Sequence, residues 1–273
     1  MAAAVRENGL DKFYTVSSIA EKCIASVGFL YNWNSWDLVI EPSAGNGSFL
    51  HKIPTLKRIG IDIAPEHSDI VQQDYLTYIP PDVKNILVIG NPPFGKVCSL
   101  AIKFFNHGAR NASVIAFIVP RTFRRISVQN KLDLHFHLVH DEDIPTHSFS
   151  PPMNAKCCFQ IWVRRDVPRV PVELSTTHED WKFLAFGVLE EGQPSVPIGA
   201  DFALRAYGGK CGEIVTEIAA LRPKSWHWIK SNISVSLLMT RFAFLDYSLS
   251  KDTARQNSIG RGELVKLYSE KYD

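Results

Sequence analysis

The segment at residues 89–96, IGNPPFGK, places a carboxamide, two prolines and a phenyl ring directly after the hydrophobic run NILVIG. Pro92 and Pro93 fix the backbone and have no N–H groups, so the segment offers carbonyl acceptors in fixed directions. Asn91 adds a second neutral acceptor, and Phe94 adds a flat apolar face. Two converging acceptors suit an amine with two hydrogens. The segment is therefore predicted to bind a planar ring bearing an NH2 group, such as adenine, cytosine or a carboxamide, with a rigid structural turn as the alternative.

A glycine-rich turn follows an earlier predicted strand, in VIEPSAGNGSFL. Glu41 ends the strand, Gly45 and Gly47 let a ligand approach the backbone, and a helix N-terminus after the turn would offer free N–H groups. The spacing is not the GxGxxG dinucleotide fingerprint, and the sequence contains no GxxxxGK[ST] phosphate loop. The turn is interpreted as part of a ligand site of another kind, with a purely structural turn as the alternative.

Two aspartates follow the next two predicted strands. Asp62 ends the strand RIGID, 17 residues after Gly45, where a carboxylate can accept hydrogen bonds from both hydroxyls of a ribose. Asp74, in VQQDYL, stands where a third strand would end, and its side chain could accept from the exocyclic amine of an adenine ring. Solvent-exposed aspartates at strand ends are the alternative at both positions.

Short apolar runs alternate with helical segments along this part of the chain. The alternation is typical of a mostly parallel α/β sheet covered on both faces, in which ligands bind beyond the carboxyl ends of the strands. Each motif above falls at such an end. The expected strands are WDLVIEP, RIGIDI, NILVIGN, SVIAFIVP, FHLVHDEDI and CCFQIWVRR, and the expected helices are residues 16–27 with Thr15 as N-cap, SFLHKI and SLAIKFFNHGAR.

The composition changes after CCFQIWVRR, where the chain continues as the Pro- and Thr-rich DVPRVPVELSTTHEDW. A boundary is predicted between residues 166 and 175. It would divide a catalytic domain at residues 1–165 from a substrate-recognition region at residues 166–273. The shorter, mixed elements of the second region predict an α+β structure.

Composition restricts the classes of function. With 273 residues, 45% of them hydrophobic and 21% charged, the chain is typical of a globular protein, and a net charge of +2 excludes a uniformly basic nucleic-acid coat. The five cysteines lack CxxC or His-rich spacing, so they are predicted to be reduced thiols, and no metal site is predicted. The N-terminus lacks a secretory pattern and the longest apolar runs are too short to cross a bilayer, which predicts an intracellular protein, cytoplasmic or nuclear, with no membrane partner.

Three basic segments are candidates for nucleic-acid binding. One segment contains Arg121, Arg124 and Arg125, just beyond a predicted strand end and with no acid between them. These arginines are interpreted as phosphate contacts, with a solvated charge run as the alternative. Lys210 follows a Gly-Gly pair in RAYGGKCGEI, where a simple hairpin turn is an equal alternative. Lys224 lies in RPKSWHWIKSN, whose alternate tryptophans share one strand face, so at least one is expected in the core.

Three of these motifs, taken in order, resemble a known family. EPSAGNGSFL, GIDIAP and NPPF are similar to motifs of the class I S-adenosylmethionine-dependent amino-methyltransferases, especially the N6-adenine methyltransferases of the NPPF type. DKFYT, at residues 11–15, is similar to the segment that lies ahead of the fold in many members and touches the methionine part of the cofactor. Val16 stands where many relatives have proline, a change expected to affect loop stiffness. The resemblance covers roughly residues 11–165 and implies a Rossmann-like class I methyltransferase sheet followed by a C-terminal α+β substrate-binding extension.

The resemblance also implies a role for each matching residue. Asn91 and the Pro92 carbonyl would hold the target amine, and Phe94 would stack on the target ring. The residues implied to bind S-adenosylmethionine are Tyr14 and Thr15 beside the methionine carboxylate, Glu41, Gly45 and Gly47 around the methionine and sulfonium, Asp62 and Ile63 at the ribose, Asp74 near the adenine, and Asn91.

The function implied is methyl transfer to N6 of adenine in a nucleic acid, with DNA favoured over RNA. A base in a duplex would have to be flipped out at a cost of a few kcal/mol. Three alternatives remain. They are N6-adenosine methylation of RNA, including the nucleotide next to a cap, N5-methylation of a protein glutamine, whose enzymes usually carry Tyr at the fourth NPP position, and a non-catalytic nucleic-acid-binding subunit.

Overall fold

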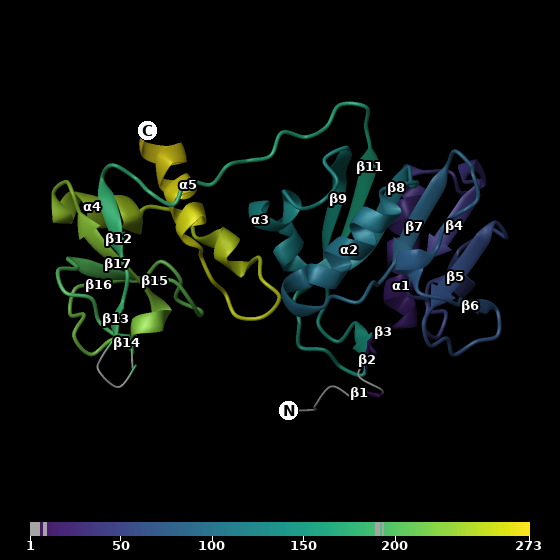
Figure 1. Ribbon diagram of the computed structural model, residues 1–273, viewed down its shortest axis with the longest axis horizontal. Coiled ribbons are helices and arrows are strands. Elements are labelled where there is room, and N and C mark those ends of the chain that lie inside the picture. The colour runs from purple at the N-terminus through teal and green to yellow at the C-terminus, as the bar shows by residue number, and fades with distance from the viewer. Residues whose placement is uncertain (1–5, 8–9, 189–191, 193) are drawn as a thin grey trace. The chain divides into compact units, whose positions relative to one another are not determined.

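The computed structural model describes residues 6–7, 10–188, 192 and 194–273 (Figure 1). The chain falls into two compact units, Met1–Pro171 and Val172–Asp273. The division lies inside the stretch of changed composition at residues 166–175. Each unit has a hydrophobic core of its own.

A seven-stranded sheet forms the centre of the first unit, with the strand order β6-β5-β4-β7-β8-β11-β9. The pairings from β6 to β8 are all parallel, and β11 runs antiparallel to both of its neighbours. This arrangement confirms the predicted mostly parallel, Rossmann-like α/β sheet. The strands are β4 (Leu38–Glu41), β5 (Arg58–Asp62), β6 (Ile70–Gln72), β7 (Ile86–Gly90), β8 (Val114–Pro120), β9 (Phe136–Ile144) and β11 (Cys157–Arg164).

Helices cover both faces of this sheet, as Figure 1 shows. Leu87 and Ile89 of β7 pack in one cluster with α1 (Ser17–Leu30), whereas Val88 packs in another cluster with α2 (Ser99–Gly108). Successive residues of a strand point to opposite faces, so a strand covered on both faces is apolar throughout. This explains the uninterrupted hydrophobic run ahead of the NPPF segment.

The N-terminal cap of α1 differs from the prediction. Thr15 lies in β3 (Tyr14–Thr15), which pairs with β10 (Phe149–Ser150), so it is not the cap. Val16 occupies the cap position without a side-chain hydrogen bond, and its N–H donates to the carbonyl of Ser148 (3.0 Å). The strand pairing therefore continues up to the first residue of the helix.

The helix predicted for SFLHKI is also wrong. Turns occupy this segment and end in the short 3-10 helix η2 (Leu50–Lys52). Gly45 and Gly47 have φ angles of +50° and +76°, which interrupt any helical path. The carboxylate of Glu41 accepts the N–H of Leu50 (2.7 Å), so a side chain replaces the partner that a helix would supply.

Short elements make up most of the remaining connections in the first unit. They are β1 (Arg6–Glu7), β2 (Leu10–Asp11), η1 (Trp33–Ser35), η3 (Tyr75–Thr77), η4 (Lys96–Cys98), η5 (Arg121–Arg124) and α3 (Ile126–Gln129).

Within the described residues, no helix combines the length and the apolar character that crossing a bilayer requires.

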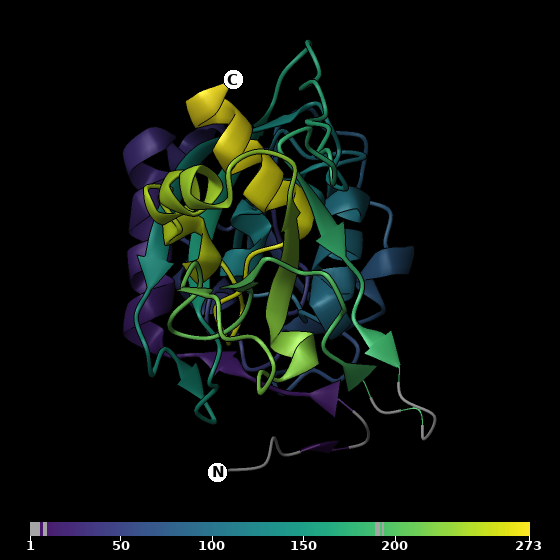
Figure 2. The ribbon, with the colours of Figure 1, turned by 90° about the vertical axis from the view of Figure 1, so that its left-hand side faces the viewer.

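The second unit is an antiparallel sheet, β12-β17-β15-β16, with two helices packed on one face (Figure 2). Phe202 and Ile229 of the sheet share a core with Phe242 and Tyr268 of the helices, which confirms the predicted α+β extension. Its elements are β12 (Trp181–Leu184), β13 (Gly187–Val188), β14 (Pro194–Ser195), β15 (Phe202–Arg205), β16 (Ile214–Val215), η6 (Pro223–Ser225), β17 (Trp226–Ser231), α4 (Val235–Ala243), η7 (Ser248–Lys251) and α5 (Arg261–Tyr272).

The alternate tryptophans of β17 are both core residues. Trp226 is 7% exposed and Trp228 is 2% exposed, and they share a cluster with Ala203. The expectation that at least one of them is buried is confirmed.

His227, between these tryptophans, gives the second unit a sensitivity to acid. Its Nε2 hydrogen-bonds the carbonyl of Ile259 (2.8 Å), and burial, aided by nearby Arg261, lowers its pKa. Below about pH 6.5 the unfolded histidine binds a proton that the folded one resists, so stability should fall as the pH drops through that value. His227→Gln keeps a donor that does not titrate. We expect urea unfolding to show a smaller loss of unfolding free energy between about pH 7.5 and about pH 5.5 for this variant than for the wild type, whereas equal losses would contradict the assignment.

Candidate active site

The carboxyl ends of three adjacent parallel strands bring the predicted motifs together. Glu41 ends β4, Asp62 ends β5, and Asn91 directly follows β7. Because β4 pairs in register with both β5 and β7, these residues meet at one edge of the sheet. The position expected from the sequence is therefore the position observed.

A polar hollow opens at this edge. Its walls come from the segment ahead of α1, from the end of β4 with the glycine turn, and from the residue after β7. The lining residues are Phe13, Tyr14, Thr15, Glu41, Ser43, Ala44, Asn46, Ser48, Phe49 and Asn91.

Asn91 is held with one side of its amide engaged and the other side unpartnered. Its Nδ2 donates to the carbonyl of Phe13 (3.1 Å), and the hydroxyl of Ser43 donates to its backbone carbonyl (3.0 Å). Its Oδ1 is buried without a partner in the described structure, as is the hydroxyl of Thr15, which lines the same hollow. A buried acceptor without a donor costs about 1–3 kcal/mol, so both atoms suit contact with a ligand.

The rest of the NPPF segment is tied to the sheet and to α2. Pro92 is buried, and Phe94 is half-buried against the core cluster on the α1 side. The Phe94 carbonyl accepts the N–H groups of Leu100 and Ala101, in the first turn of α2. The Phe94 ring thus packs in part against the protein, with its remaining surface exposed. Pro93 is likewise half-buried.

Glu41 is 2% exposed, and its carboxylate fixes the conformation of the glycine turn. Burial raises its pKa well above the ordinary value, although the N–H groups of Leu50 and Phe49 act in the opposite direction. The carboxyl group therefore serves first as the acceptor that fixes the turn, and it also faces the hollow.

Asp62 connects the end of β5 to the glycine turn. Its Oδ2 accepts the N–H of Gly45 (2.8 Å), and its Oδ1 accepts the N–H of Ala64 (2.8 Å). Each carboxylate oxygen can accept a further bond. Gly45 has no substitute here, because its φ is positive and an added Cβ would lie 2.6 Å from the Tyr14 ring.

Two residues at this edge, Glu66 and Ser43, are not among the residues predicted from the sequence. Glu66 accepts a hydrogen bond from the Tyr14 hydroxyl, pairs with Lys12 (3.4 Å), and donates its N–H to the Gly45 carbonyl (2.9 Å). Ser43 contacts Asn91 as described above. Glu66 lies in the loop that directly follows Asp62, and this closeness in sequence was the one available signal.

Asp74 and Ile63 lie further out. Asp74 is exposed, and its Oδ1 caps η3 by accepting the N–H of Leu76 (2.9 Å). Ile63 is 49% exposed in the loop after β5. Neither residue lines the hollow.

The arginines expected to form an open basic segment are paired with acids. Arg124 contacts Asp141 and Asp143 (2.9 Å to the latter), and Arg121 contacts Asp143 (2.5 Å). The hydrogen bond to Asp141 raises the pKa of Arg124. The acids come from β9, far along the chain, so the local absence of acids around these arginines was misleading. Arg125 is half-buried.

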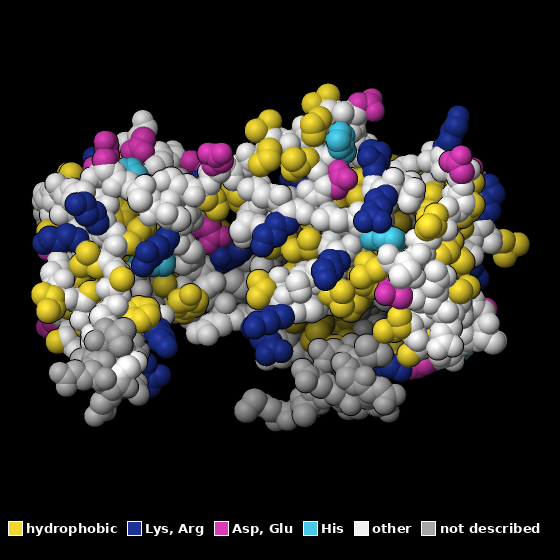
Figure 3. Space-filling view, in the orientation of Figure 1, with side chains coloured by type: hydrophobic (Ala, Val, Ile, Leu, Met, Phe, Trp, Pro, Cys, Tyr) yellow, Lys and Arg dark blue, Asp and Glu magenta, His cyan; other side chains and the backbone are white. Residues whose placement is uncertain are grey.

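The two lysines expected to contact nucleic acid lie in the second unit. Lys210 is exposed and contacts Glu213 (3.3 Å), in the connection between the antiparallel strands β15 and β16. The segment therefore connects two antiparallel strands, and a role of Lys210 in nucleic-acid binding stays a prediction. Lys224 is exposed in η6. Figure 3 shows Lys and Arg side chains spread over the visible face rather than gathered in one patch.

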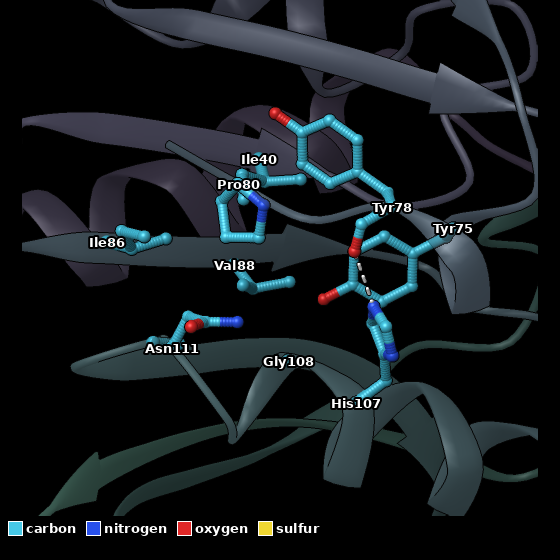
Figure 4. A pocket seen from close by; sticks show the side chains of 10 residues that line it. Ile40, Tyr75, Tyr78, Pro80, Ile86, Val88, His107, Gly108 and Asn111 are labelled. Carbon is cyan, nitrogen blue, oxygen red and sulfur yellow. Dashed lines mark hydrogen bonds between the residues drawn. The ribbon is translucent and has the colours of Figure 1, made fainter. Parts of the chain in front are cut away.

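A second hollow lies between the sheet and α2 (Figure 4). Its wall is largely apolar, with Ile40, Ile86 and Val88 on the sheet side, and His107 bonds the carbonyl of Tyr78 across it (2.9 Å). It contains none of the predicted site residues. We therefore assign the candidate active site to the first hollow.

No protein-family model and no curated protein matches this chain. Among solved structures, the 23S rRNA methyltransferase ErmE is 15% identical, with a TM-score of 0.43 over 58% of this chain and 72% of that one. A chain of a type I R-M system is 15% identical, with a TM-score of 0.44 over 67% of this chain and 46% of that one, about half its length. Magnesium protoporphyrin IX methyltransferase of Synechocystis PCC 6803, solved with bound SAM, is 12% identical, with a TM-score of 0.39 over 55% of this chain and 79% of that one. At 12–15% identity, these likenesses concern the fold and not the chemistry.

Proposed function

We propose that this chain is an S-adenosylmethionine-dependent methyltransferase that methylates N6 of adenine in nucleic acid, with DNA as the favoured polymer. The observation that carries the proposal is the buried, unpartnered Oδ1 of Asn91, a residue that lines the polar hollow. An acceptor in this position lacks one thing, a donor, and an amine with two hydrogens supplies it.

The residues that line the hollow and those beside it fit the proposed cofactor. The unpartnered hydroxyl of Thr15 suits a polar end group such as the methionine carboxylate. Glu41 and the glycine turn would surround the sulfonium, and Asp62 has the remaining acceptor capacity for a ribose. Asp74 would meet the adenine from outside the hollow, with Ile63 beside the ribose. Bound S-adenosylmethionine would supply an electrophilic methyl group.

The protein's part in the reaction is to position the amine. Asn91 Oδ1 and the Pro92 carbonyl would accept its two hydrogens, which draws the nitrogen lone pair out of conjugation and toward the methyl carbon. Transfer would form the N–C bond as the S–C bond of the cofactor breaks, with S-adenosylhomocysteine as the leaving group, and the product amine would release one proton to water. Positioning of this kind, with Phe94 against the ring, needs no strong base.

The ion pairs of Arg121 and Arg124 favour a second candidate function, methylation of a protein glutamine. These arginines already contact aspartates, which weakens the argument for a phosphate-binding surface in the first unit. A protein glutamine amide also presents two hydrogens on a conjugated nitrogen and would fit the same acceptors. The same site geometry would be expected for an enzyme that methylates RNA and for a non-catalytic nucleic-acid-binding subunit.

The decisive experiment is methyl transfer from radiolabelled S-adenosylmethionine to matched single- and double-stranded DNA and RNA oligonucleotides, followed by nucleoside digestion and mass spectrometry. N6-methyladenine in DNA is the expected product. N6-methyladenine only in RNA would keep the reaction and change the polymer. Cofactor binding without transfer to any oligonucleotide would overturn the nucleic-acid substrate and direct the search to protein amides.

A further inference from the structure

Outside the hollow, three side chains with metal-binding groups meet at the surface of the first unit. His51 lies in η2, directly after the glycine turn, and His67 and Asp69 lie in the loop between β5 and β6. All three are exposed, and each offers one ligand atom such that these atoms lie within 4.8 Å of one another. No other group of this kind is present among the described residues.

The geometry of the group is close to what a metal ion requires. His51 Nε2 lies 3.0 Å from Asp69 Oδ2, and the two imidazole rings meet edge to face with centroids 4.9 Å apart. Ligand atoms around a tetrahedral zinc ion lie about 3.4 Å apart, because each bond is about 2.1 Å long. Small rotations of exposed side chains would therefore complete the set.

Gly47 leaves room for one of these side chains. The His51 ring lies directly over Gly47, where an added Cβ would overlap it. The ring thus occupies the space that a side chain at Gly47 would take, and Asp69 holds the ring through the contact described above.

We propose that His51, His67 and Asp69 form a binding site for a divalent transition-metal ion. Two imidazole nitrogens and one carboxylate oxygen favour zinc and similar ions over Mg²⁺ or Ca²⁺, which prefer oxygen ligands throughout. Solvent would supply the remaining ligand, since all three side chains are exposed. The ion would tie η2 to the loop between β5 and β6, and its binding does not depend on the proposed methyl transfer.

The test is a zinc titration of the full chain, without an affinity tag, against a chromophoric zinc chelator. The wild type is expected to bind one zinc ion per chain with a Kd below about 10 µM. His67→Gln and Asp69→Asn should each weaken binding at least about tenfold, because each removes one of three ligands. Their urea unfolding without zinc should match the wild type, which shows that the loss is not a loss of folding.

His135→Gln is the matched control. His135 is also exposed beside an aspartate, Asp133 (3.5 Å), but this pair has no third ligand among the described residues. The control should bind zinc like the wild type. The proposal is overturned by a wild type that shows no stoichiometric binding at this affinity, or by a His67→Gln variant that retains the wild-type affinity.

Discussion

Replacing Asn91 with alanine is expected to lower the rate of methyl transfer by about 10²–10³-fold, the usual effect of losing one positioned hydrogen-bonding group in an active site. In the proposed reaction, Asn91 Oδ1 holds the amine, and alanine has no acceptor. Binding of S-adenosylmethionine should change little, because most of the proposed cofactor contacts would come from other residues. Single-turnover rates and calorimetric titration with the cofactor would measure the two effects separately.

Two variants make this result specific. Asn91→Ala and Asn91→Asp both remove the bond that Nδ2 donates to the Phe13 carbonyl. They differ in that the aspartate variant keeps acceptor oxygens at this position. If the acceptor matters, the aspartate variant should retain more activity than the alanine variant. Asn111→Ala, at the second hollow, should leave the rate unchanged. Full activity in Asn91→Ala would refute the role assigned to this residue.

Replacing Asp62 with alanine is expected to raise the Kd for S-adenosylmethionine by about 10²-fold, since hydrogen bonds to a charged group contribute about 1.5–3 kcal/mol each. The variant loses the acceptors for the proposed ribose, and it also frees the N–H of Gly45 that Asp62 holds (2.8 Å). Equilibrium binding of the cofactor measures the change, and urea unfolding shows how much stability is lost with it.

Asp74→Ala is the comparison for Asp62. Asp74 is exposed and follows the adjacent strand, so its loss should cost about tenfold or less in cofactor affinity. Asp62→Asn, which keeps one oxygen, should fall between the two. An Asp62→Ala variant that binds the cofactor like the wild type would remove Asp62 from the site.

The strands could be predicted because the apolar residues that bury them are consecutive in the sequence. Runs such as VIAFIVP in β8 are apolar at every position, and in the structure all seven residues are buried. The segment after the glycine turn could not be predicted in this way. SFLHKI has helical spacing, but Gly45 and Gly47 turn the chain and Glu41 takes the N–H of Leu50.

The placement of the candidate site could be predicted wherever its residues stand at strand ends. Glu41, Asp62 and Asn91 converge because parallel strands bring their carboxyl ends to one edge. Contacts between distant segments left no such signal. The pairing of Arg124 with Asp141 and the meeting of His51 with His67 depend on the three-dimensional fold, as does the bond between Tyr14 and Glu66.

The pairing of Arg121 and Arg124 with the aspartates of β9 has a consequence for the thermodynamics of polyanion binding. A free arginine that meets a phosphate releases a counterion from the nucleic acid, which makes the affinity fall steeply with added salt. An arginine that must first leave an aspartate exposes a carboxylate, and this carboxylate takes up a cation from solution. The net release of ions is then smaller, so association through these arginines would depend on salt more weakly than their number suggests.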